Sequence, residues 1–525
     1  MLLEGKAENL AVPIWSHLCK RHDLLAMPAV LAMLGGCNLD WEKPEASAPP
    51  PARFREAKPK EAPSIGSAHD FAAKFASKEL TSVVDQALAN NYDIAAAVAR
   101  IAQADANARV SSSALWPALT MTGSAERFNI PGTATSSTAS SPSSAASLAA
   151  SGASSSSGFS AYRSNTYALG LNASYEIDFW GKNEDASKAG RLLANASRFD
   201  RNVVEIASIA SVLNSYFQVL NAQDRLRIAR ENVRIAYEVF KAIKARLDAG
   251  TATVLDTSQQ ETVLDTQKAS IPPLEETFRQ QKNLLAVLLG RTPESFDTKS
   301  VSLVKLRFPH VEPGLPSEVL LRRPDVAEAE AKLASQEFSV LQARASFFPS
   351  ITLTGQYGVQ SLLLKNLLTP QAIAWQILAN AAQPLFDGYN LQGQYMLQQG
   401  KYAELAADYR KQALTALSDT ENALIAIAQT GLQLKLQADA VGAARRALVA
   451  AQARLREGTI DIVTLSTTET AYFQNQDTLE QVRLAHFEAA TSLYQALGGG
   501  WAPTTREAEI ARADEAYDSD KGPWP

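Results

Sequence analysis

Hydrophobic and polar residues recur with two different periods along this chain, and each period predicts a different kind of element. Apolar residues repeat at helical spacing over residues 80–115, 181–247, 254–271, 390–455 and 462–497. Apolar and polar residues alternate one by one over residues 116–126, 167–179, 350–360 and, more weakly, 372–386, which predicts four strands with one apolar and one polar face. The polar positions are candidates for lining a lumen: Thr120, Thr122, Glu176, Asp178, Thr352 and Thr354.

A predicted helix followed by a predicted strand occurs twice along the chain, with matching residues. Asp93 and Asp325 are 232 residues apart, and the same offset relates Pro117 to Pro349 and Gly123 to Gly355. Farther along, a second repeated block has an offset of 208 residues, which relates Gly250 to Gly458 and Glu261 to Glu469. Two copies of one long unit predict an extended body with two similar halves, the first over 79–314 and the second over 315–500.

The number of predicted strands bears on the assembly. A soluble sandwich would show the same alternation with its apolar face inward. However, the first two strands are joined by a Ser-rich segment, 130–164, that is typical of an outer loop and not of a core. Four strands cannot close a barrel, because about eight are needed to enclose a filled interior. Open sheet edges are not tolerated in lipid, so we expect several copies of the chain to complete a membrane barrel.

The two longest predicted helices, 181–247 and 390–455, contain no proline. Each would extend on the order of 100 Å if it were continuous. Many of their apolar positions are alanine, which allows close helix packing in a coiled coil. Both stretches end at a Gly-Thr pair, Gly250-Thr251 and Gly458-Thr459, where glycine can adopt the left-handed conformation that ends a helix. The predicted fold is therefore mainly α-helical with a smaller membrane β-region.

The N-terminus has the pattern of an export signal. Lys20 and Arg21 precede a short apolar run over 24–34, which suits a signal peptide and is too short to span a bilayer. Small residues directly before Cys37 resemble the bacterial lipobox, which implies a signal peptide over 1–36 and acylation of Cys37. In that resemblance Asn38 favours the outer membrane. We expect 37–78 to be a lipidated tether, extended where Pro, Ala, Lys and Glu are abundant, and 501–525 to be a loosely held periplasmic tail.

Composition and charge narrow the functional classes. The net charge is −5, and a general nucleic-acid-binding protein is expected to be basic. The sequence has no phosphate-binding loop, no His-Glu-x-x-His pattern and no Cys-x-x-Cys pattern. The histidines His69, His310 and His486 show no ligand spacing. We therefore expect no enzymatic activity, no cofactor and no metal site.

Several ordered motifs resemble one family. They are Leu315-Pro-Ser-Glu followed by Arg322-Arg323-Pro324-Asp325, then Phe347-Phe348-Pro349, then Pro384-Leu-Phe386-Asp387-Gly388, and the earlier Leu288-Leu289-Gly290-Arg291. Together they are similar to TolC-like outer-membrane efflux channels, and most similar to the NodT-type lipoprotein branch that works with RND pumps. The resemblance covers residues 80–500. It implies a homotrimer with a twelve-stranded barrel, four strands per chain, above a periplasmic α-helical tunnel, and passive export of small molecules with a periplasmic adaptor and an inner-membrane RND pump as partners.

The resemblance also assigns roles to the helix turns. It places adaptor docking at the tips, Gly250, Thr251, Gly458 and Thr459, and a pore constriction at Asp461, Val463, Thr464 and Thr467, with Asp256 near the first tip. Thr464 and Thr467 stand where relatives often carry acids. A charged ring and a constriction made by packing and hydroxyl groups both remain open. Two other functions remain open as well: a channel of the same architecture for type I protein secretion, and a periplasmic coiled-coil scaffold without a pore.

Overall fold

The computed structural model describes residues 41–45, 50–51, 53–55, 66–130, 162–298, 302–311 and 314–501. The chain divides into two units, 1–44 and 45–525, and the description below concerns the second unit. The predicted signal peptide, the lipidation site Cys37, residues 131–161 of the Ser-rich loop and residues 502–525 of the predicted tail lie outside the described residues.

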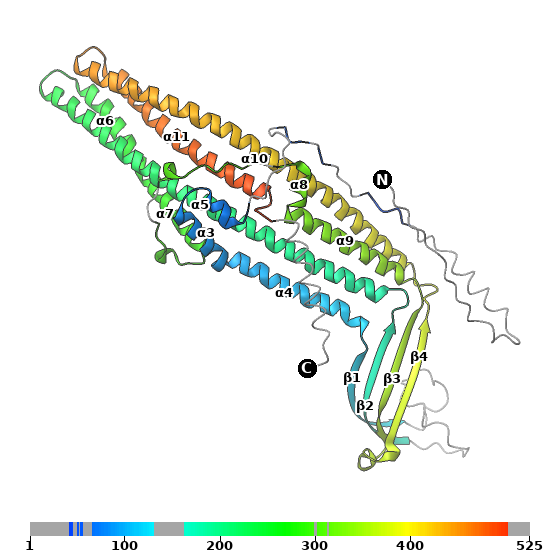
Figure 1. Cartoon of the computed structure of the whole chain (residues 1–525). Helices are drawn as coiled ribbons and strands as arrows, with labels where there is room; N and C mark the ends of the chain where they lie inside the picture. Colours follow the sequence, from blue (N-terminus) through cyan, green and yellow to red (C-terminus); the bar gives the residue numbers. More distant parts are fainter. Residues whose placement is uncertain are drawn as a thin grey trace, which may run out of the picture. The chain divides into compact units, whose positions relative to one another are not determined.

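Four antiparallel strands form a single sheet at one end of the helices (Figure 1). The strands are β1 (Ala118–Ile130), β2 (Tyr162–Ile177), β3 (Ser350–Ser361) and β4 (Ile373–Ala382), and they lie in the order β1-β2-β3-β4. The two repeats join through β2 and β3, where Gly170 lies opposite Gly358. The backbones approach closely there, because a Cβ atom on Gly358 would lie 2.5 Å from the carbonyl oxygen of Leu169. The prediction of two hairpins and four strands per chain is confirmed.

Two helices of 67 residues each, α5 (Lys182–Asp248) and α10 (Asn390–Arg456), run from the strands to paired turns at the far end (Figure 1). The first turn leads into α6 (Val254–Ala269) and α7 (Ile271–Leu288), and the second leads into the continuous helix α11 (Ile462–Ala496). Pro272 and Pro273 lie in the first turn of α7, where a missing N–H group breaks no hydrogen bond. The predicted interruption at this pair is therefore the start of a new helix.

The predicted helix over 80–115 is divided at Asn91, which separates α3 (Lys78–Asn90) from α4 (Tyr92–Ser112). The Asn91 side-chain oxygen accepts hydrogen bonds from the backbone N–H groups of Asp93 and Ile94, at 2.8 and 3.2 Å. Its amide nitrogen donates to the carbonyl oxygen of Leu288, at 2.9 Å. This helix cap, which uses both ends of the amide, starts a new helix at a position where hydrophobic periodicity shows no break.

The repeat counterpart of α4 is α9 (Pro324–Ala345), which follows the short helix α8 (Pro316–Leu321). Asp93 and Asp325, the first repeated pair in the sequence, both lie in the first turn of their helices. Single turns of 3₁₀ helix occur at Ser113–Leu115, Pro293–Ser295, Leu303–Lys305, Leu364–Asn366 and Pro370–Ala372.

The main hydrophobic core lies where α3, α5, α7 and α11 meet, midway along the helices. Its fully buried members include Tyr216, Phe217, Leu220 and Leu285. A second core lies nearer the turns and joins α5, α6, α10 and α11 through residues such as Val239, Leu264, Leu448 and Leu465.

The expectation of a tether over 37–78 is wrong for the last part of that range. Helix α2 (Ala68–Ala73) carries Phe71, whose ring stacks on Tyr494 with a centroid separation of 4.4 Å. Phe75 lies 5.2 Å from the ring of Phe217, and both Phe71 and Phe75 are completely buried. Phe54 is buried as well. Burial of these aromatic rings holds the segment against the helices.

The predicted tail also begins differently from the expectation. Trp501, its first residue, is buried and meets the ring of Phe199 edge-on at 5.8 Å. Ala327 and Ala331 of α9 belong to the same small cluster. The packed body therefore extends at least one residue past the predicted boundary at Gly500.

Candidate functional site

The two turns at the far end of the helices have the same geometry. Gly250 and Gly458 have φ values of 74° and 72°, in the left-handed region that favours glycine. The Thr251 N–H donates to the Arg246 carbonyl oxygen at 2.8 Å, and the Thr459 N–H donates to that of Arg454 at 2.9 Å. In both turns the threonine hydroxyl donates to the same carbonyl oxygen, at 3.0 Å. The Gly-Thr pair thus closes the last helical turn twice, once in each repeat.

The acidic residue next to each turn caps the helix that follows. Asp461 accepts a hydrogen bond from the backbone N–H of Thr464, at 2.8 Å. Asp256 accepts from both the backbone N–H and the hydroxyl of Thr253, at 2.8 and 2.9 Å, and so completes a capping box. The two acids predicted to lie at the constriction therefore also have a structural role as helix caps, which was not predicted from the sequence.

The cap also affects the charge of Asp461. Hydrogen bonds from the hydroxyl and the backbone N–H of Thr464 hold the pKa of Asp461 below its usual value. The side chain is exposed and ionised at neutral pH. Each protomer therefore carries one fixed negative charge at the start of α11.

The other three predicted constriction residues lie together on one side of α11. Val463, Thr464 and Thr467 are exposed, and Thr467 follows Val463 by four positions and Thr464 by three, so Thr467 lies beside both of them on the helix surface. The neighbouring residues Ile462 and Leu465 are buried in the core near the turns. The hydroxyl of Thr467 donates to the carbonyl oxygen of Val463 at 2.8 Å. The exposed face is thus formed by one valine and two threonines, and it carries no charge.

A buried carboxyl group that was not predicted as a site residue lies farther along α11. Glu469 is completely buried and accepts a hydrogen bond from the Gln260 side chain of α6, at 2.9 Å. Ser466 donates to the other end of that amide, at 3.2 Å. Burial raises the pKa of Glu469, while the hydrogen bond from Gln260 acts in the opposite direction. Helical spacing could have found this residue, because Glu469 follows the buried Leu465 by four positions and precedes the buried Phe473 by four.

The strand pairing places most of the predicted lumen-facing residues on one side of the sheet. Thr120 pairs with Asn172, Asn172 with Gln356, and Gln356 with Gln376, so these four side chains form a row across all four strands. Strand alternation places Thr122, Glu176, Thr352 and Thr354 on the same face. Leu119, Met121, Leu171, Tyr357 and Trp375 lie on the other face, and all five are exposed.

Asp178 is an exception to this arrangement. Strand β2 ends at Ile177, and the Asp178 carboxylate accepts a hydrogen bond from the backbone N–H of Glu184 in the first turn of α5, at 2.7 Å. Its predicted place on the strand face is wrong, because the first N–H groups of α5 lack partners within the helix and one of them, that of Glu184, donates to this carboxylate. Glu176 keeps its place on the polar face, where it pairs with Lys182 at 2.6 Å.

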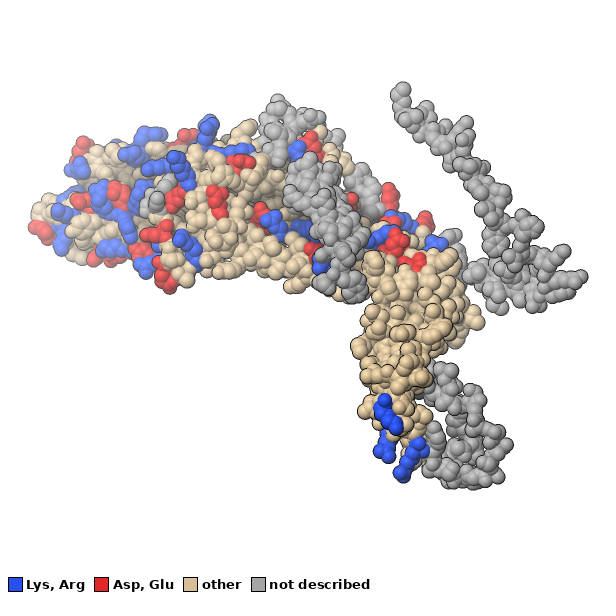
Figure 2. Space-filling model, turned by 60° about the horizontal axis from the view of Figure 1, so that its bottom comes forward, with Lys and Arg blue, Asp and Glu red and all other residues tan. Residues whose placement is uncertain are grey.

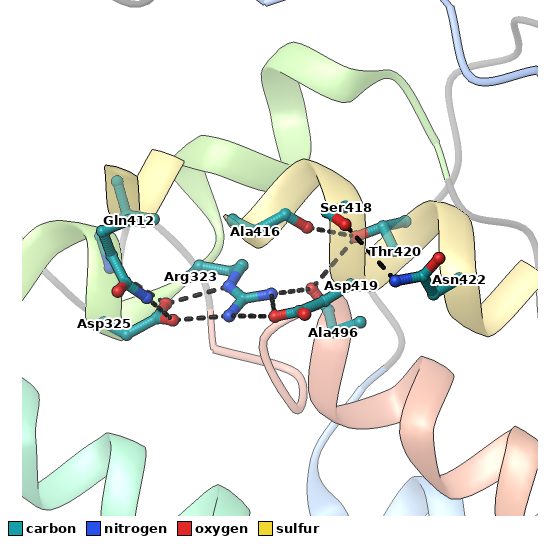
Figure 3. Close-up of polar contacts among 10 residues, drawn as sticks. Arg323, Asp325, Gln412, Ala416, Ser418, Asp419, Thr420, Asn422 and Ala496 are labelled. Atoms are coloured by element: carbon teal, nitrogen blue, oxygen red, sulfur yellow. Dashed lines mark hydrogen bonds and ion pairs between the residues drawn. The ribbon is translucent and has the colours of Figure 1, made fainter. Parts of the chain in front are cut away.

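The Arg-Arg-Pro-Asp motif forms a junction between three helices (Figure 3). The Arg323 guanidinium binds both carboxylate oxygens of Asp325, at 3.0 and 2.6 Å, and also contacts Asp419 of α10 at 3.3 Å. It donates to the carbonyl oxygen of Ala496, the last residue of α11, at 3.3 Å. Gln412 of α10 donates to Asp325 at 2.5 Å. Arg323 is buried, and its planar group joins α9, α10 and α11 at one point.

Known proteins that resemble this chain all indicate the same family. The family model described as "Outer membrane efflux protein" matches residues 83–291 and 315–499, which include the sheet, both turns and the Arg323 junction. The chain belongs to this family. The family match begins and ends within the two predicted repeats, and the gap between its two parts falls between α7 and α8.

Individual members of the outer membrane efflux protein family agree with this assignment. The pyoverdine export outer membrane protein OpmQ of Pseudomonas aeruginosa is 34% identical over 431 residues, which cover 81% of this chain and 86% of OpmQ. The probable outer membrane lipoprotein SilC of Salmonella typhimurium is 26% identical, over 91% of this chain and 98% of SilC.

Solved structures show the same fold. The outer-membrane channel OprN aligns with a TM-score of 0.76 at 25% identity, over 88% of this chain and 98% of OprN. The Campylobacter jejuni outer membrane channel CmeC gives a TM-score of 0.78 at 21% identity, over 91% of this chain and 99% of CmeC. The chain is thus an outer-membrane efflux channel subunit of the TolC-like, RND-associated kind, with four barrel strands and a long helical tunnel segment.

Proposed function

We propose that three copies of this chain form a passive export duct whose periplasmic end is closed by an uncharged constriction on α11. The sheet supports the trimer, because a four-stranded sheet leaves β1 and β4 as edges that lipid does not tolerate, and three sheets supply twelve strands. The observation that carries the proposed constriction is the exposed face of Val463, Thr464 and Thr467, which Ile462 and Leu465 fix in place from beneath.

We propose that the turns bind a periplasmic adaptor, which in turn couples the duct to an inner-membrane RND pump. Val254 and Leu255, which follow the first turn, are 70% and 66% exposed, and such apolar side chains at a helix tip suit a protein partner. Energy for transport comes from the pump, and docking opens the constriction by shifting α11 relative to α10. Acylation of Cys37 anchors the N-terminus in the outer membrane.

The polar face of the sheet supports export of small molecules. Its central row consists of a threonine hydroxyl and three side-chain amides, from Thr120, Asn172, Gln356 and Gln376. Such a face offers hydrogen bonds to a passing solute without the strong binding that a charged ring would impose. Small organic molecules therefore fit this duct better than bare metal ions.

Single-channel conductance of the purified protein in a planar bilayer tests the constriction. We expect a small closed-state conductance in the wild type and a clear increase when Val463, Thr464 and Thr467 are all replaced by alanine. The matched variant Asp461→Asn retains an oxygen that can cap α11 but removes the charge, so its closed-state conductance should equal that of the wild type.

Two outcomes contradict the proposal. If Asp461→Asn alone opens the channel or abolishes a preference for cations, the constriction depends on a charged ring. If none of the proteins conducts although each inserts as a trimer, the chain forms no pore and the scaffold function gains support.

A further inference from the structure

Positive charge on the sheet is confined to its outer end. Among the described residues of the four strands and the β3–β4 connection, the basic side chains are Arg127, Arg163 and Lys365, and all three are exposed. Figure 2 shows blue side chains at the free end of an otherwise uncharged region, far from the mixed charges of the helices. Positive charge that is confined to one end indicates a binding surface, because charges that only keep a protein soluble are dispersed and of both signs.

The two arginines lie on the apolar face of the sheet. Arg127 follows Leu119 and Met121 by even numbers of residues on β1, so all three side chains project from the same face. Arg163 pairs with Asn129, which shares that face, and the Arg163 Nε atom donates to the Asn129 side-chain oxygen at 3.2 Å. Glu126 is adjacent to Arg127 in sequence but points to the opposite, polar face.

The position of these arginines corresponds to a membrane boundary. Arg127 lies eight residues beyond Leu119, which corresponds to roughly 27 Å along the strand and about 20 Å across a membrane at the usual strand tilt. Exposed aromatic rings lie just beyond the opposite ends of the strands, among them Trp116 (64% exposed), Phe179 (72%) and Phe386 (82%). A band bounded by aromatic residues on one side and arginines on the other has about the height of the lipid-facing surface of an outer-membrane barrel, ~25 Å.

We propose that Arg127 and Arg163, together with Lys365, bind the phosphate groups of lipid in the outer leaflet, with a phosphate-bearing glycolipid as the occupant. A guanidinium group matches phosphate oxygens with two parallel hydrogen bonds, and the arginines lie at the depth where lipid phosphates are found. Three protomers repeat the cluster around the barrel and give a belt of three lipid sites. This inference rests on the proposed trimeric duct, in which the apolar face points into lipid.

Native mass spectrometry of the detergent-solubilised trimer tests the lipid site. The probes are lipid A, which carries phosphates, and dephosphorylated lipid A with the same acyl chains. We expect the double variant Arg127→Gln/Arg163→Gln to bind lipid A roughly ten- to thirtyfold more weakly than the wild type does. The double variant and the wild type should bind the dephosphorylated lipid with the same affinity. A triple variant that adds Lys365→Gln should bind lipid A more weakly still. Lys401→Gln/Lys411→Gln is the matched control, because it removes two exposed charges from α10 and should leave lipid A binding unchanged.

The remaining arms of the experiment separate alternative results. Millimolar inorganic phosphate should not displace lipid A, and displacement would mean that the cluster binds free anions instead of lipid. Equal binding of lipid A by the wild type and the double variant, or equal binding of both lipids by the wild type, overturns the inference. Conductance of the same preparations is recorded in parallel. Unchanged conductance with unchanged lipid binding rejects the lipid site alone, whereas a wild type that does not conduct rejects the duct.

Discussion

At the scale of single residues, three consecutive glycines end α11 because backbones meet there. Gly498, Gly499 and Gly500 all have positive φ values, of 81°, 58° and 88°. A Cβ atom on Gly498 would lie 1.9 Å from the carbonyl oxygen of Arg322, and one on Gly500 would lie 1.7 Å from that of Gly66. From the sequence, this triplet is only a helix breaker. In the fold it is the point where the N-terminal segment and the α8–α9 junction contact the end of α11.

We expect Gly498→Ala to lower the free energy of unfolding by about 2 kcal/mol or more, because it adds a backbone clash to the strain of a left-handed conformation. The midpoint of thermal unfolding, followed by the helical circular dichroism signal in detergent, measures this loss. Gly250→Ala is the control, since Gly250 has a similar φ of 74° but no atom within 4 Å of the added Cβ position. Its loss should be about 1 kcal/mol. Equal losses in the two variants would contradict the argument from close approach.

A second residue-scale prediction concerns Arg323. We expect Arg323→Lys to lower the free energy of unfolding by about 1–2 kcal/mol, because an ammonium group cannot bind Asp325, Asp419 and the Ala496 carbonyl oxygen together. The adjacent Arg322 pairs with Glu318 at 3.4 Å, and Arg322→Lys can keep that pair. Chemical denaturation of both variants measures the difference. A loss that is as large for Arg322→Lys would show that the junction does not depend on the arginine fork.

At the scale of elements, the two helical hairpins have similar turns, but equivalent residues within them are packed differently. The Gly-Thr turns repeat closely, since each depends on a few neighbouring residues. The caps use the same two positions with threonine and aspartate exchanged, Thr253 and Asp256 in the first repeat and Asp461 and Thr464 in the second. Glu261 and Glu469 occupy equivalent positions after these turns, yet Glu261 is exposed and Glu469 is buried. The first return is broken into α6 and α7, whereas α11 is continuous, so equivalent positions meet different neighbours.

We expect Glu469→Gln to raise the unfolding midpoint at pH 7.5. Burial raises the pKa of this carboxyl in the fold, so its stabilising contribution is complete below the ordinary value of 4.5 and is lost as the pH rises through the folded-state pKa. Glutamine is neutral at pH 7.5 and at about pH 4, and it retains an oxygen that can accept from the Gln260 amide. The gain should therefore disappear at about pH 4.

Glu261→Gln is the control for this pH series. Its side chain is exposed in the equivalent position of the first repeat, so the midpoint should not change at either pH. Thermal unfolding of both variants at the two pH values measures the effect. A gain for Glu469→Gln that persists at pH 4 would show that packing, and not ionisation, is responsible.

At the scale of the whole molecule, the orientation of the sheet decides how the assembly works. One face has a row of hydroxyl and amide groups, and the other has exposed leucine, tyrosine and tryptophan side chains. A single chain exposes both faces. A closed trimer in a membrane places the apolar face in lipid and the polar face around the lumen, which satisfies both surfaces.

Two neighbouring residues on β2 test this orientation. We expect Leu171→Lys to destabilise the membrane-inserted trimer by about 2–4 kcal/mol, because a charge near the middle of the lipid-facing band must be removed from water. Asn172→Lys should leave the trimer intact, lower conductance for cations and favour anions. Trimer survival on heating and ion selectivity in a bilayer are the two measurements. A stable Leu171→Lys trimer with altered selectivity would reverse the assignment of the faces.

The sequence by itself determined the periodic elements, the duplication, the number of strands and the positions of the two turns. The elements and turns depend on residues two to four positions apart or on a single glycine, and the duplication is a direct match between two stretches of sequence, so a linear pattern contains all of them. The set at Val463, Thr464 and Thr467 came from the family resemblance and not from periodicity, and the structure adds that all three side chains are exposed.

Only the tertiary structure decided the contacts between distant segments. Phe71 and Phe75 lie in the range predicted to be a tether, and they are buried because α5 and α11, which are far away in sequence, provide an aromatic pocket. Asp178 and Asp461 cap helices instead of only presenting charge, because unpaired N–H groups lie within reach. The burial of Glu469 and the three-helix junction at Arg323 depend on which helices pack together, and a period along one helix does not specify its neighbours.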